Sequence, residues 1–461
     1  MAGKKYIECV GPTYALSDKK AGVQRAVNCF PKKLYGDEWM LQSIPGEVTI
    51  AALTNEIRGL RDVMGRFFVV SGASLIEITN ASTGAYTVRG TLITTSGVVS
   101  MSHNKTQLAI VDGNNLYVYT LITNTLTRIT VAGWRGSDNV TELDGYFIFV
   151  DPGTDQFYIS AIDDGSTLDA LDFSSADSSP DDIITHLVNH RQVWFFGKDN
   201  STEIWINSGA QAFPFIRYQS YTLDIGCVGK HAAINAADTV FWIGKTDRGT
   251  GIVYVATGNQ PQRVSTTPVE EALRSSSDLS QATMWAYQTD GNEFIGINAP
   301  GLETTWVYDA ATQQWHERGE WSAGWQPLRT KMHIAFDGEH YAGDANGNIV
   351  RLDTTLNALS GRVLKRERTW PHLIKETLEP VSYLGLELAA ASGHGGNITL
   401  EISNNGGYTF GPMLLRSLGA TGRWMQRIRW LGLGTAINRV FRISCTDDVP
   451  FAIHSATVDV P

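Results

Sequence analysis

Cysteine is scarce in this chain of 461 residues, which contains four, Cys9, Cys29, Cys227 and Cys445, with no Cys-x-x-Cys spacing. This pattern indicates neither a disulfide framework nor a zinc site, and it predicts reduced, mostly buried thiols. Charged residues are also few, at 18%, whereas 45 glycines and 13 tryptophans are present. Because helix-rich proteins usually carry more charge and less glycine, the composition favours many short strands joined by tight turns.

Long apolar runs are missing as well. No stretch approaches the ~18 apolar residues that a membrane span needs, and residues 1–14 lack the apolar segment of a signal peptide. We therefore expect a protein that folds in the cytoplasm in which it is made, with no membrane insertion. The net charge of -10 argues against a bulk surface that binds phosphates, although local basic patches are compatible with it.

Seven β-hairpin patterns follow one another at a spacing of about forty to fifty residues, the range in which a repeat indicates a propeller or a solenoid. Each pattern joins two runs of aromatic and β-branched residues through a turn. In residues 146–159, for example, the turn is Asp151-Pro152-Gly153-Thr154-Asp155. The other six patterns span residues 66–78, 107–119, 192–206, 239–255, 293–308 and 340–352.

A further pattern indicates that these hairpins belong to blades. Residues 308–315 begin with Tyr308-Asp309 and end with Trp315, which is close to the kelch-type signature. A four-stranded blade cannot cover its own two apolar faces, so blades must stack around an axis. We predict an all-β protein in which residues 51–360 form a β-propeller of six or seven blades.

Two segments flank the predicted propeller. Residues 1–50 hold seven lysines and arginines with few acids before Asp37, and they lack both strand alternation and helical periodicity. We expect an extended N-terminal arm, either a solvated leader along the domain edge or a docking arm. Residues 361–461 predict an appended C-terminal β-sandwich-like domain, with strand patterns at 383–389, 398–403, 425–431 and 440–445.

Positive charge is densest where this C-terminal domain begins. Arg362, Lys365, Arg366 and Arg368 lie ahead of Pro371 in a basic connecting segment. The strands that follow carry six more arginines, Arg416, Arg423, Arg427, Arg429, Arg439 and Arg442. The propeller holds most of the acid, so the two domains differ in charge.

One residue pair imitates a zinc site. His186 and His190 have the spacing of two ligands on a helix, but Leu187 stands where a zinc protease has its Glu. The flanking residues favour a strand, on which the two rings would lie about 13 Å apart, too far to share an ion. We interpret both as structural histidines.

A second stretch imitates a calcium loop. The run Asp344-Ala345-Asn346-Gly347-Asn348 places oxygen ligands at alternate positions, but Ile349 and Thr355 stand where the loop requires Gly and a bidentate Glu. A hairpin turn at Asn346-Gly347 explains the run better. The sequence thus offers no metal ligand, cofactor site or catalytic residue, and we predict a protein that is not an enzyme.

One motif keeps an enzymatic alternative open. Residues 403–410 resemble the Asp-box hairpin of sialidases, with Asn405 where that family has Asp. The motif occurs once, outside the repeated region, and it is a structural hairpin even in sialidases. The alternative is therefore a glycan-binding or sialidase-like propeller enzyme that acts on host surface polysaccharide, with a pocket at the propeller mouth.

Many ungapped runs across nearly the whole chain resemble the packaged-DNA stabilisation proteins of short-tailed bacteriophages. One of them, residues 168–176, reads LDALDFSSA. The others are residues 20–25, 30–31, 145–149, 152–160, 179–182, 261–266, 269–270 and 423–441. Thr267 departs from the His expected of that family, and this difference affects one local contact.

The resemblance implies a virion structural protein, the hub or nozzle of a short tail, assembled in the cytoplasm of the host bacterium. The family would form a six-fold ring below the portal and its adaptor, retain the packaged genome and provide the DNA exit conduit. The implied partners are further copies of the chain, the adaptor, a tail spike or fibre, a tail needle or plug, and genomic double-stranded DNA in the channel.

Within this role we expect Arg362, Lys365, Arg366, Arg368 and His372 to contact neighbouring subunits or the adaptor. The acidic bulk surface would suit a channel along which DNA slides, because few phosphates would be held by cations. Solubility explains the acidity equally well.

Overall fold

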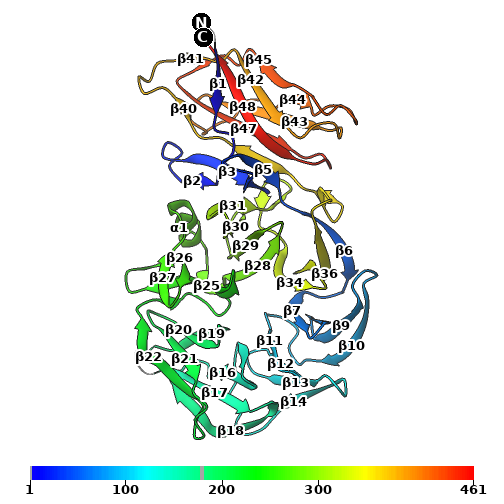
Figure 1. Ribbon diagram of the computed structural model, residues 1–461, viewed down its shortest axis with the longest axis vertical. Helices are drawn as coiled ribbons and strands as arrows, with labels where there is room; N and C mark the ends of the chain where they lie inside the picture. Colours follow the sequence, from blue (N-terminus) through cyan, green and yellow to red (C-terminus); the bar gives the residue numbers. More distant parts are fainter. Residues whose placement is uncertain (1–2, 177–180) are drawn as a thin grey trace.

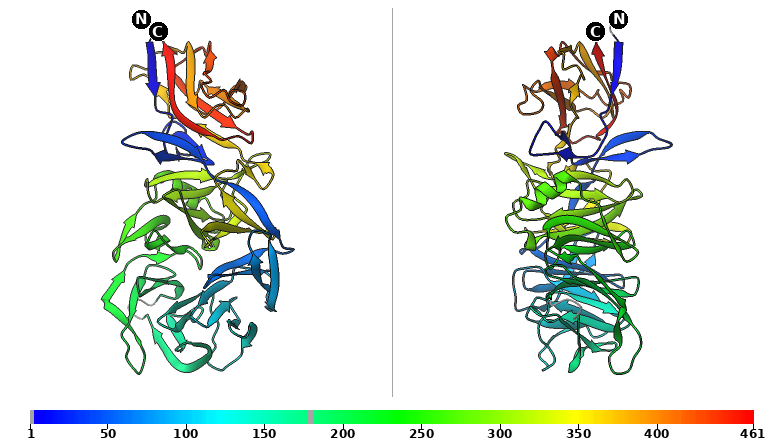
Figure 2. Two further views of the ribbon diagram at one scale, coloured as in Figure 1. Left: turned by 45° about the vertical axis from the view of Figure 1, so that its right-hand side comes forward. Right: turned by 90° about the vertical axis from the view of Figure 1, so that its left-hand side faces the viewer.

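The structure is a computed structural model that describes residues 3–176 and 181–461. Strands are by far the most frequent regular element of its described residues, which contain one α-helix, α1 (Thr267–Arg274). Figure 1 shows a ring of β-sheets and a smaller β-sandwich that stands on the rim of the ring. Figure 2 shows the ring edge-on, with the sandwich continuing along the long axis. The predicted fold class, a β-propeller with a C-terminal β-sandwich, is confirmed.

The ring is a propeller of seven antiparallel blades. The first blade contains β7 (Ile57–Val63), β8 (Arg66–Ser71), β9 (Ser74–Asn80) and β10 (Ala85–Thr91), and the second contains β11 (Ser100–His103), β12 (Gln107–Val111), β13 (Leu116–Thr120) and β14 (Thr125–Ile129). The third blade contains β15 (Val140–Leu143), β16 (Tyr146–Val150), β17 (Gln156–Ala161) and β18 (Asp164–Ser175). The fourth contains β19 (Ile183–Asn189), β20 (Gln192–Gly197), β21 (Thr202–Asn207) and β22 (Phe215–Leu223). The fifth and sixth are β24 (Ala233–Ala236), β25 (Thr239–Thr246), β26 (Gly249–Thr257) and β27 (Gln260–Arg263), with β23 (Gly226–Cys227) beside β25; and β28 (Thr283–Thr289), β29 (Asn292–Asn298), β30 (Thr305–Asp309) and β31 (Gln314–Arg318). The seven predicted hairpins are the second and third strands of the seven blades.

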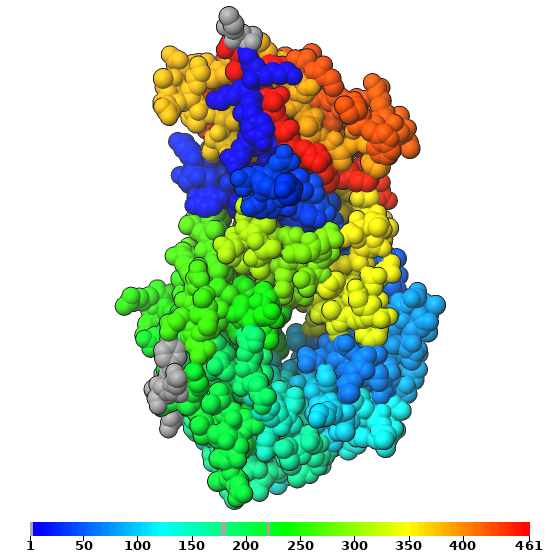
Figure 3. Space-filling view, viewed as in Figure 1, coloured from blue at the N-terminus to red at the C-terminus, as the bar shows by residue number. Residues whose placement is uncertain are grey.

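The seventh blade closes the ring with a strand from the beginning of the chain. It contains β34 (Thr330–Phe336), β35 (Glu339–Asp344), β36 (Asn348–Asp353) and β6 (Gly46–Ala52), which pairs antiparallel with β36. The innermost strands of the seven blades pack against one another in a complete circle, including β34 against β7. Figure 3 shows an opening near the middle of this circle. Strand β6 therefore fastens the last blade to the segment that leads into the first.

Continuous apolar runs form the central strands because both faces of a blade are buried. On β8, Phe68 packs against Tyr119 of the second blade, with ring centroids 5.1 Å apart. Its neighbour Phe67 points to the opposite face and packs against Phe336 and Tyr341 of the seventh blade, at 5.2 Å and 5.3 Å. Successive side chains on a strand point to opposite faces, so neighbouring phenylalanines join the first blade to two different blades.

The sandwich consists of two facing sheets. One contains β4 (Cys29–Lys33), β5 (Trp39–Ser43), β48 (Ala452–Val460), β42 (Gly385–Ala390) and β45 (Ile428–Leu431), with β1 (Gly3–Ile7) on β48. The other contains β3 (Val23–Val27), β39 (Arg366–Thr369), β47 (Asn438–Cys445), β43 (Asn397–Ser403) and β44 (Leu414–Ser417). The Asp-box-like turn lies between β43 and β44, where the Asn405 side chain accepts a hydrogen bond from the Thr409 amide at 3.0 Å.

The N-terminal segment, expected as an extended arm, is extended and paired along most of its length. Strand β1 runs antiparallel to β48, with Gly3 opposite Val460 and Ile7 opposite Ala456. Strand β3 lies between β31 of the sixth blade and β39 of the sandwich. One short strand of the segment thus continues the sheet of the propeller into the sheet of the sandwich, and the two ends of the chain lie side by side (Figure 1).

Buried and partly buried histidines of the blades give the fold a predictable response to acid. Burial lowers the pKa of His186 to about 4, of His231 to about 4 and of His333 to about 3. A histidine with an unfolded pKa near 6.5 then binds its proton in the unfolded chain first, so stability falls as pH drops below about 6.5. Burial also raises the pKa of Glu47 to about 7, and this carboxyl opposes the histidines because it stabilises the fold as pH falls.

We therefore expect the free energy of unfolding to fall between about pH 6.5 and pH 4.5, by at most about 1.4 kcal/mol per pH unit for each histidine. The measurement is urea unfolding at a series of pH values. A His186→Gln variant serves as the matched comparison, because glutamine can still donate to the Ile148 carbonyl that His186 contacts at 3.0 Å. In this variant the free energy of unfolding should change less steeply with pH, by the contribution of one proton bound on unfolding. Equal slopes in the two proteins would contradict the assignment.

Candidate functional site

The basic connecting segment lies at the junction between the propeller and the sandwich. It includes β38 (Arg362–Val363) and β39, which is hydrogen-bonded to β3 on one side and to β47 on the other. All four residues of β39 are buried, including Arg366 and Arg368, which have no exposed surface. We call Arg362, Lys365, Arg366 and Arg368 the arginine junction.

Arg368 binds the N-terminal segment. Its guanidinium donates to the carbonyls of Cys9 and Pro12, each at 3.0 Å, and to that of Arg25 at 3.4 Å. Burial lowers the pKa of Arg368 to about 10, so the group is still cationic at neutral pH. A buried cation solvated by backbone carbonyls fixes the path of the chain that supplies them.

Arg366 makes the equivalent contacts on the side of the sandwich. Its guanidinium donates to the carbonyls of Asn357, Asp447 and Val449 at 3.1, 2.8 and 3.1 Å, and it lies 3.2 Å from the Cys445 sulfur. The two arginines stand two residues apart on one strand, so their side chains leave the same face of the sheet and reach different segments along it. Together they bind the first strands, the last strands and the end of the propeller.

Arg362 and Lys365 pair with carboxylates of the propeller and of β39. Arg362 bonds to Glu320 and lies 3.5 Å from Glu47 of β6. Lys365 is 2.9 Å from Glu367, and its ammonium sits 3.5 Å above the centre of the Trp321 ring. Trp321 belongs to the small hairpin of β32 (Glu320–Trp321) and β33 (Trp325–Gln326), which covers this lysine. A cation over an aromatic face is stabilised electrostatically.

His372 lies in the same region, partly buried. Its Nε2 donates to the Lys19 carbonyl at 2.8 Å, and its Nδ1 lies 2.9 Å from the side-chain amide of Asn438. The five predicted contact residues are therefore brought together, and each of them contacts other parts of the same chain. Their contact with another subunit stays a prediction. Arg366 and Arg368 could take part only indirectly, through the shape of the junction, because neither reaches the surface.

Sequence reasoning missed Asn28, which lies at the centre of the junction. Its side chain donates to the carbonyls of Gly319 and Lys365 at 2.7 and 2.8 Å and accepts from the Gly319 amide at 2.9 Å. Asn28 is fully buried and has a positive φ of 55°. The sequence did contain a signal for this role, because Asn28 is a polar residue inside the apolar run of residues 26–30. A side-chain amide buried at such a position needs hydrogen-bond partners.

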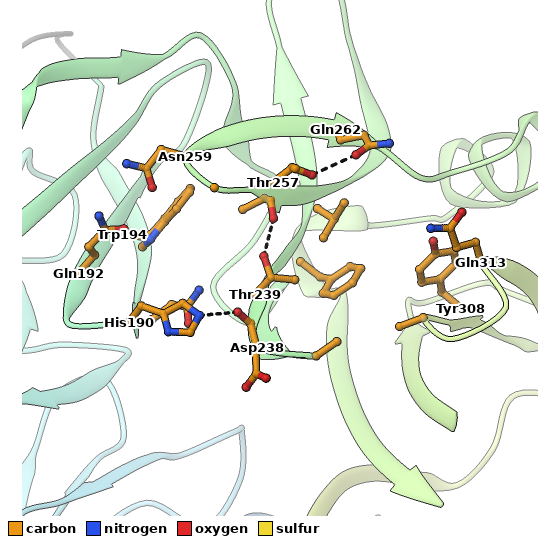
Figure 4. A pocket seen from close by; sticks show the side chains of 17 residues that line it. His190, Gln192, Trp194, Asp238, Thr239, Thr257, Asn259, Gln262, Tyr308 and Gln313 are labelled. Carbon is orange, nitrogen blue, oxygen red and sulfur yellow. Dashed lines mark hydrogen bonds between the residues drawn. The ribbon is translucent and has the colours of Figure 1, made fainter. Parts of the chain in front are cut away.

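A depression of about 640 Å³ lies on one face of the propeller, where turns of the fourth, fifth and sixth blades meet (Figure 4). Gln192, Asn259 and Gln313 present side-chain amides to it, and His190 donates to the Asp238 carbonyl at 2.7 Å on its wall. None of the described residues that line it is lysine or arginine. Uncharged amides can bind hydroxyl groups, whereas the carboxylate of an acidic sugar would lack a cation to pair with.

Within the described residues, no cluster of three or more His, Cys, Asp or Glu side chains is arranged to hold a metal ion. None of the helices described is both long and apolar enough to cross a bilayer. The four cysteines are reduced and buried, as predicted.

Both domains of the chain match one protein family. Residues 26–357 match the family model described as bacteriophage P22 Gp10, beta-propeller, and residues 365–461 match the model described as bacteriophage P22 Gp10, beta-sandwich. The chain belongs to the bacteriophage P22 Gp10 family. As a member of this family it is a phage structural protein that stabilises packaged DNA, and the arginine junction lies where the two matched regions meet.

No curated protein matches this member of the P22 Gp10 family. Solved structures that match include the computationally designed Ika8 protein, 12% identical, over 67% of this chain and 99% of that chain with a TM-score of 0.42. The extracellular domain of the one component system BT4673 from B. thetaiotaomicron is 9% identical, over 67% and 40% of the two chains, with a TM-score of 0.45. The N-terminal domain of Nup159 is 10% identical, over 70% and 97%, with a TM-score of 0.43.

Proposed function

We propose that this protein is the hub or nozzle subunit of a short phage tail. Copies of the chain form a ring, expected to be a hexamer, that attaches below the portal and its adaptor, closes the filled head and provides the conduit for the outgoing DNA. The ring assembles in the host cytoplasm and becomes part of the virion, where it also binds a tail spike or fibre and a tail needle or plug.

The observation that carries this proposal is that both matched domains are joined by a buried junction. A subunit that resists the pressure of packaged DNA has to transmit load between its domains without a hinge. Here β3 continues one sheet into the other, and Arg366 donates both to the Asn357 carbonyl at the end of the propeller and to the Asp447 carbonyl of the sandwich. The acidic propeller adds support, because a surface with few free cations lets a duplex pass without holding its phosphates.

The test is the mass of the purified protein, measured by light scattering or native mass spectrometry, alone and with its candidate adaptor ring. We expect a ring of defined size, either from the protein alone or only in the presence of the adaptor. A stable monomer that ignores the adaptor and binds or cleaves surface glycans would contradict the proposal. Such a result would favour the glycan alternative and direct attention to the depression of uncharged amides.

A further inference from the structure

Charge is divided unequally between the two ends of the molecule. Residues 1–45 and 360–461, which build the sandwich and the junction, carry 18 lysines and arginines against 12 aspartates and glutamates. Residues 46–359, which build the propeller, carry 19 against 35. Within the propeller the acid is concentrated in residues 151–182, which hold nine aspartates and no lysine or arginine. The molecule therefore has a basic end and a strongly acidic end.

The acidic end is the outer edge of the third blade, which Figure 1 places farthest from the sandwich. Its outermost strand, β18, exposes Asp169 together with Leu171, which is 80% exposed, and Phe173, which is 38% exposed. The guanidinium of Arg135 lies 4.5 Å from the centre of the Phe173 ring and is the basic group that faces this edge from the preceding turn. Burial and the nearby Asp169 raise the pKa of Asp172. Crowded carboxylates beside exposed apolar side chains form a surface that a cationic, apolar partner would stabilise.

The basic end is the outer edge of the sandwich, formed by β44 and the loop of residues 418–427. Leu415 is 55% exposed, Trp424 is 62% exposed and Met425 is 91% exposed. Arg416 and Arg423 accompany them, and neither forms an ion pair with any described residue. Arg416 instead donates to the carbonyls of Arg429 and Leu415 at 2.9 and 2.7 Å, which holds its charge at the sheet edge.

We propose that the basic end of the sandwich docks on the acidic edge of the third blade of a second copy of this chain. The two surfaces are complementary, since each combines exposed apolar side chains with unpaired charge of one sign. Two basic ends or two acidic ends would repel each other, so the contact is head-to-tail. Head-to-tail contacts generate closed rings when the rotation between copies allows closure. This inference rests on the proposed ring and specifies which surfaces form it.

A nucleic acid is a poorer occupant of the basic end. Phosphates would pair with Arg416 and Arg423, but Leu415, Trp424 and Met425 are also exposed there, and apolar side chains gain little from a phosphate backbone. DNA would also leave the apolar side chains of the acidic edge without a partner. A second copy satisfies both surfaces at once.

The test uses two variants, each altered at one end. Arg423→Glu with Met425→Asp disables the basic end, and Asp169→Lys with Leu171→Lys disables the acidic end. All four side chains are exposed, so the fold is expected to be kept, and circular dichroism checks this. Lys105→Glu, an exposed charge reversal on the second blade, is the matched control. Masses are measured by native mass spectrometry in the condition where the wild-type ring forms.

Each variant alone should be a monomer of 50.5 kDa, with self-association weakened about 100-fold or more because like charges face each other. A mixture of the two variants should associate again, since the intact basic end of one variant can dock on the intact acidic edge of the other. The control should assemble as the wild type does. Variants that still form rings would overturn this inference and leave the proposed ring standing. A wild-type protein that stays monomeric, alone and with the adaptor, would overturn both.

Discussion

Replacement of Arg368 by alanine is expected to lower the free energy of unfolding by about 3–5 kcal/mol. The side chain is fully buried, and its donors bond to the carbonyls of Cys9, Pro12 and Arg25. Alanine leaves these acceptors without a partner and opens a cavity the size of the lost side chain. The N-terminal segment then loses its attachment to β39, so the sandwich and the junction should unfold first.

The measurement is urea unfolding followed by tryptophan fluorescence, to which the buried Trp370 at the end of β39 contributes. Arg368→Lys should also destabilise, because one ammonium cannot replace the planar guanidinium at several carbonyls. The exposed Arg423 provides the control, since Arg423→Ala should change stability by less than about 0.5 kcal/mol. If Arg368→Ala unfolds at the wild-type urea concentration, Arg368 does not hold the junction together.

The Gly347→Ala substitution is expected to cost about 3–5 kcal/mol, because two penalties combine. Gly347 turns the chain from β35 into β36 with a φ of 85°, a conformation that costs alanine about 1–2 kcal/mol. A Cβ would also lie 2.3 Å from the Leu53 carbonyl oxygen and 2.7 Å from that of Asn55. The hairpin would have to move away from the segment that follows β6, which is where the propeller closes.

Gly338 offers a matched control in the same blade. It turns the chain from β34 into β35 with a φ of 76°, and a Cβ there would meet nothing within 4 Å. Gly338→Ala should therefore show only the conformational penalty of about 1–2 kcal/mol. The difference between the free energies of unfolding of the two variants measures only the steric overlap of the added Cβ with the segment that follows β6. Equal losses of free energy of unfolding in the two variants would mean that the closure of the propeller relaxes enough to accommodate the added Cβ.

The blades could be predicted from the sequence because their signals are local. A turn such as Asp112-Gly113-Asn114-Asn115 and the apolar runs on either side of it lie within a dozen residues. The last strand of the seventh blade could not be predicted in this way. Strand β6 lies about three hundred residues before β36, with which it pairs. No pattern in residues 46–52 indicates that β36 is its partner. For this reason the repeat predicted six or seven blades, and the pairing of β6 decides for seven.

The five candidate contact residues lie in one region of the structure, but their environment could not be predicted from the sequence. Charge density in residues 362–368 indicated a surface, since arginine is mostly exposed in proteins. Burial of Arg366 and Arg368 depends on carbonyls supplied by residues 9–25 and 445–449. Every residue has a backbone carbonyl, so the sequence does not indicate which carbonyls accept hydrogen bonds from these two arginines. The alternation of Arg366, Glu367 and Arg368 on one strand was the available clue to an internal ionic network.

The pairing of β1 with β48 sets the order of events during synthesis. The ribosome makes β1 first and β48 last, and at usual rates of elongation the interval is roughly 20 to 90 seconds. The first six blades can stack as they emerge, while β1, β3 and β6 wait for partners at the far end of the chain. A chain that terminates early therefore keeps these strands unpaired and lacks the sandwich. The complete fold of the subunit therefore forms only after the whole polypeptide has been made.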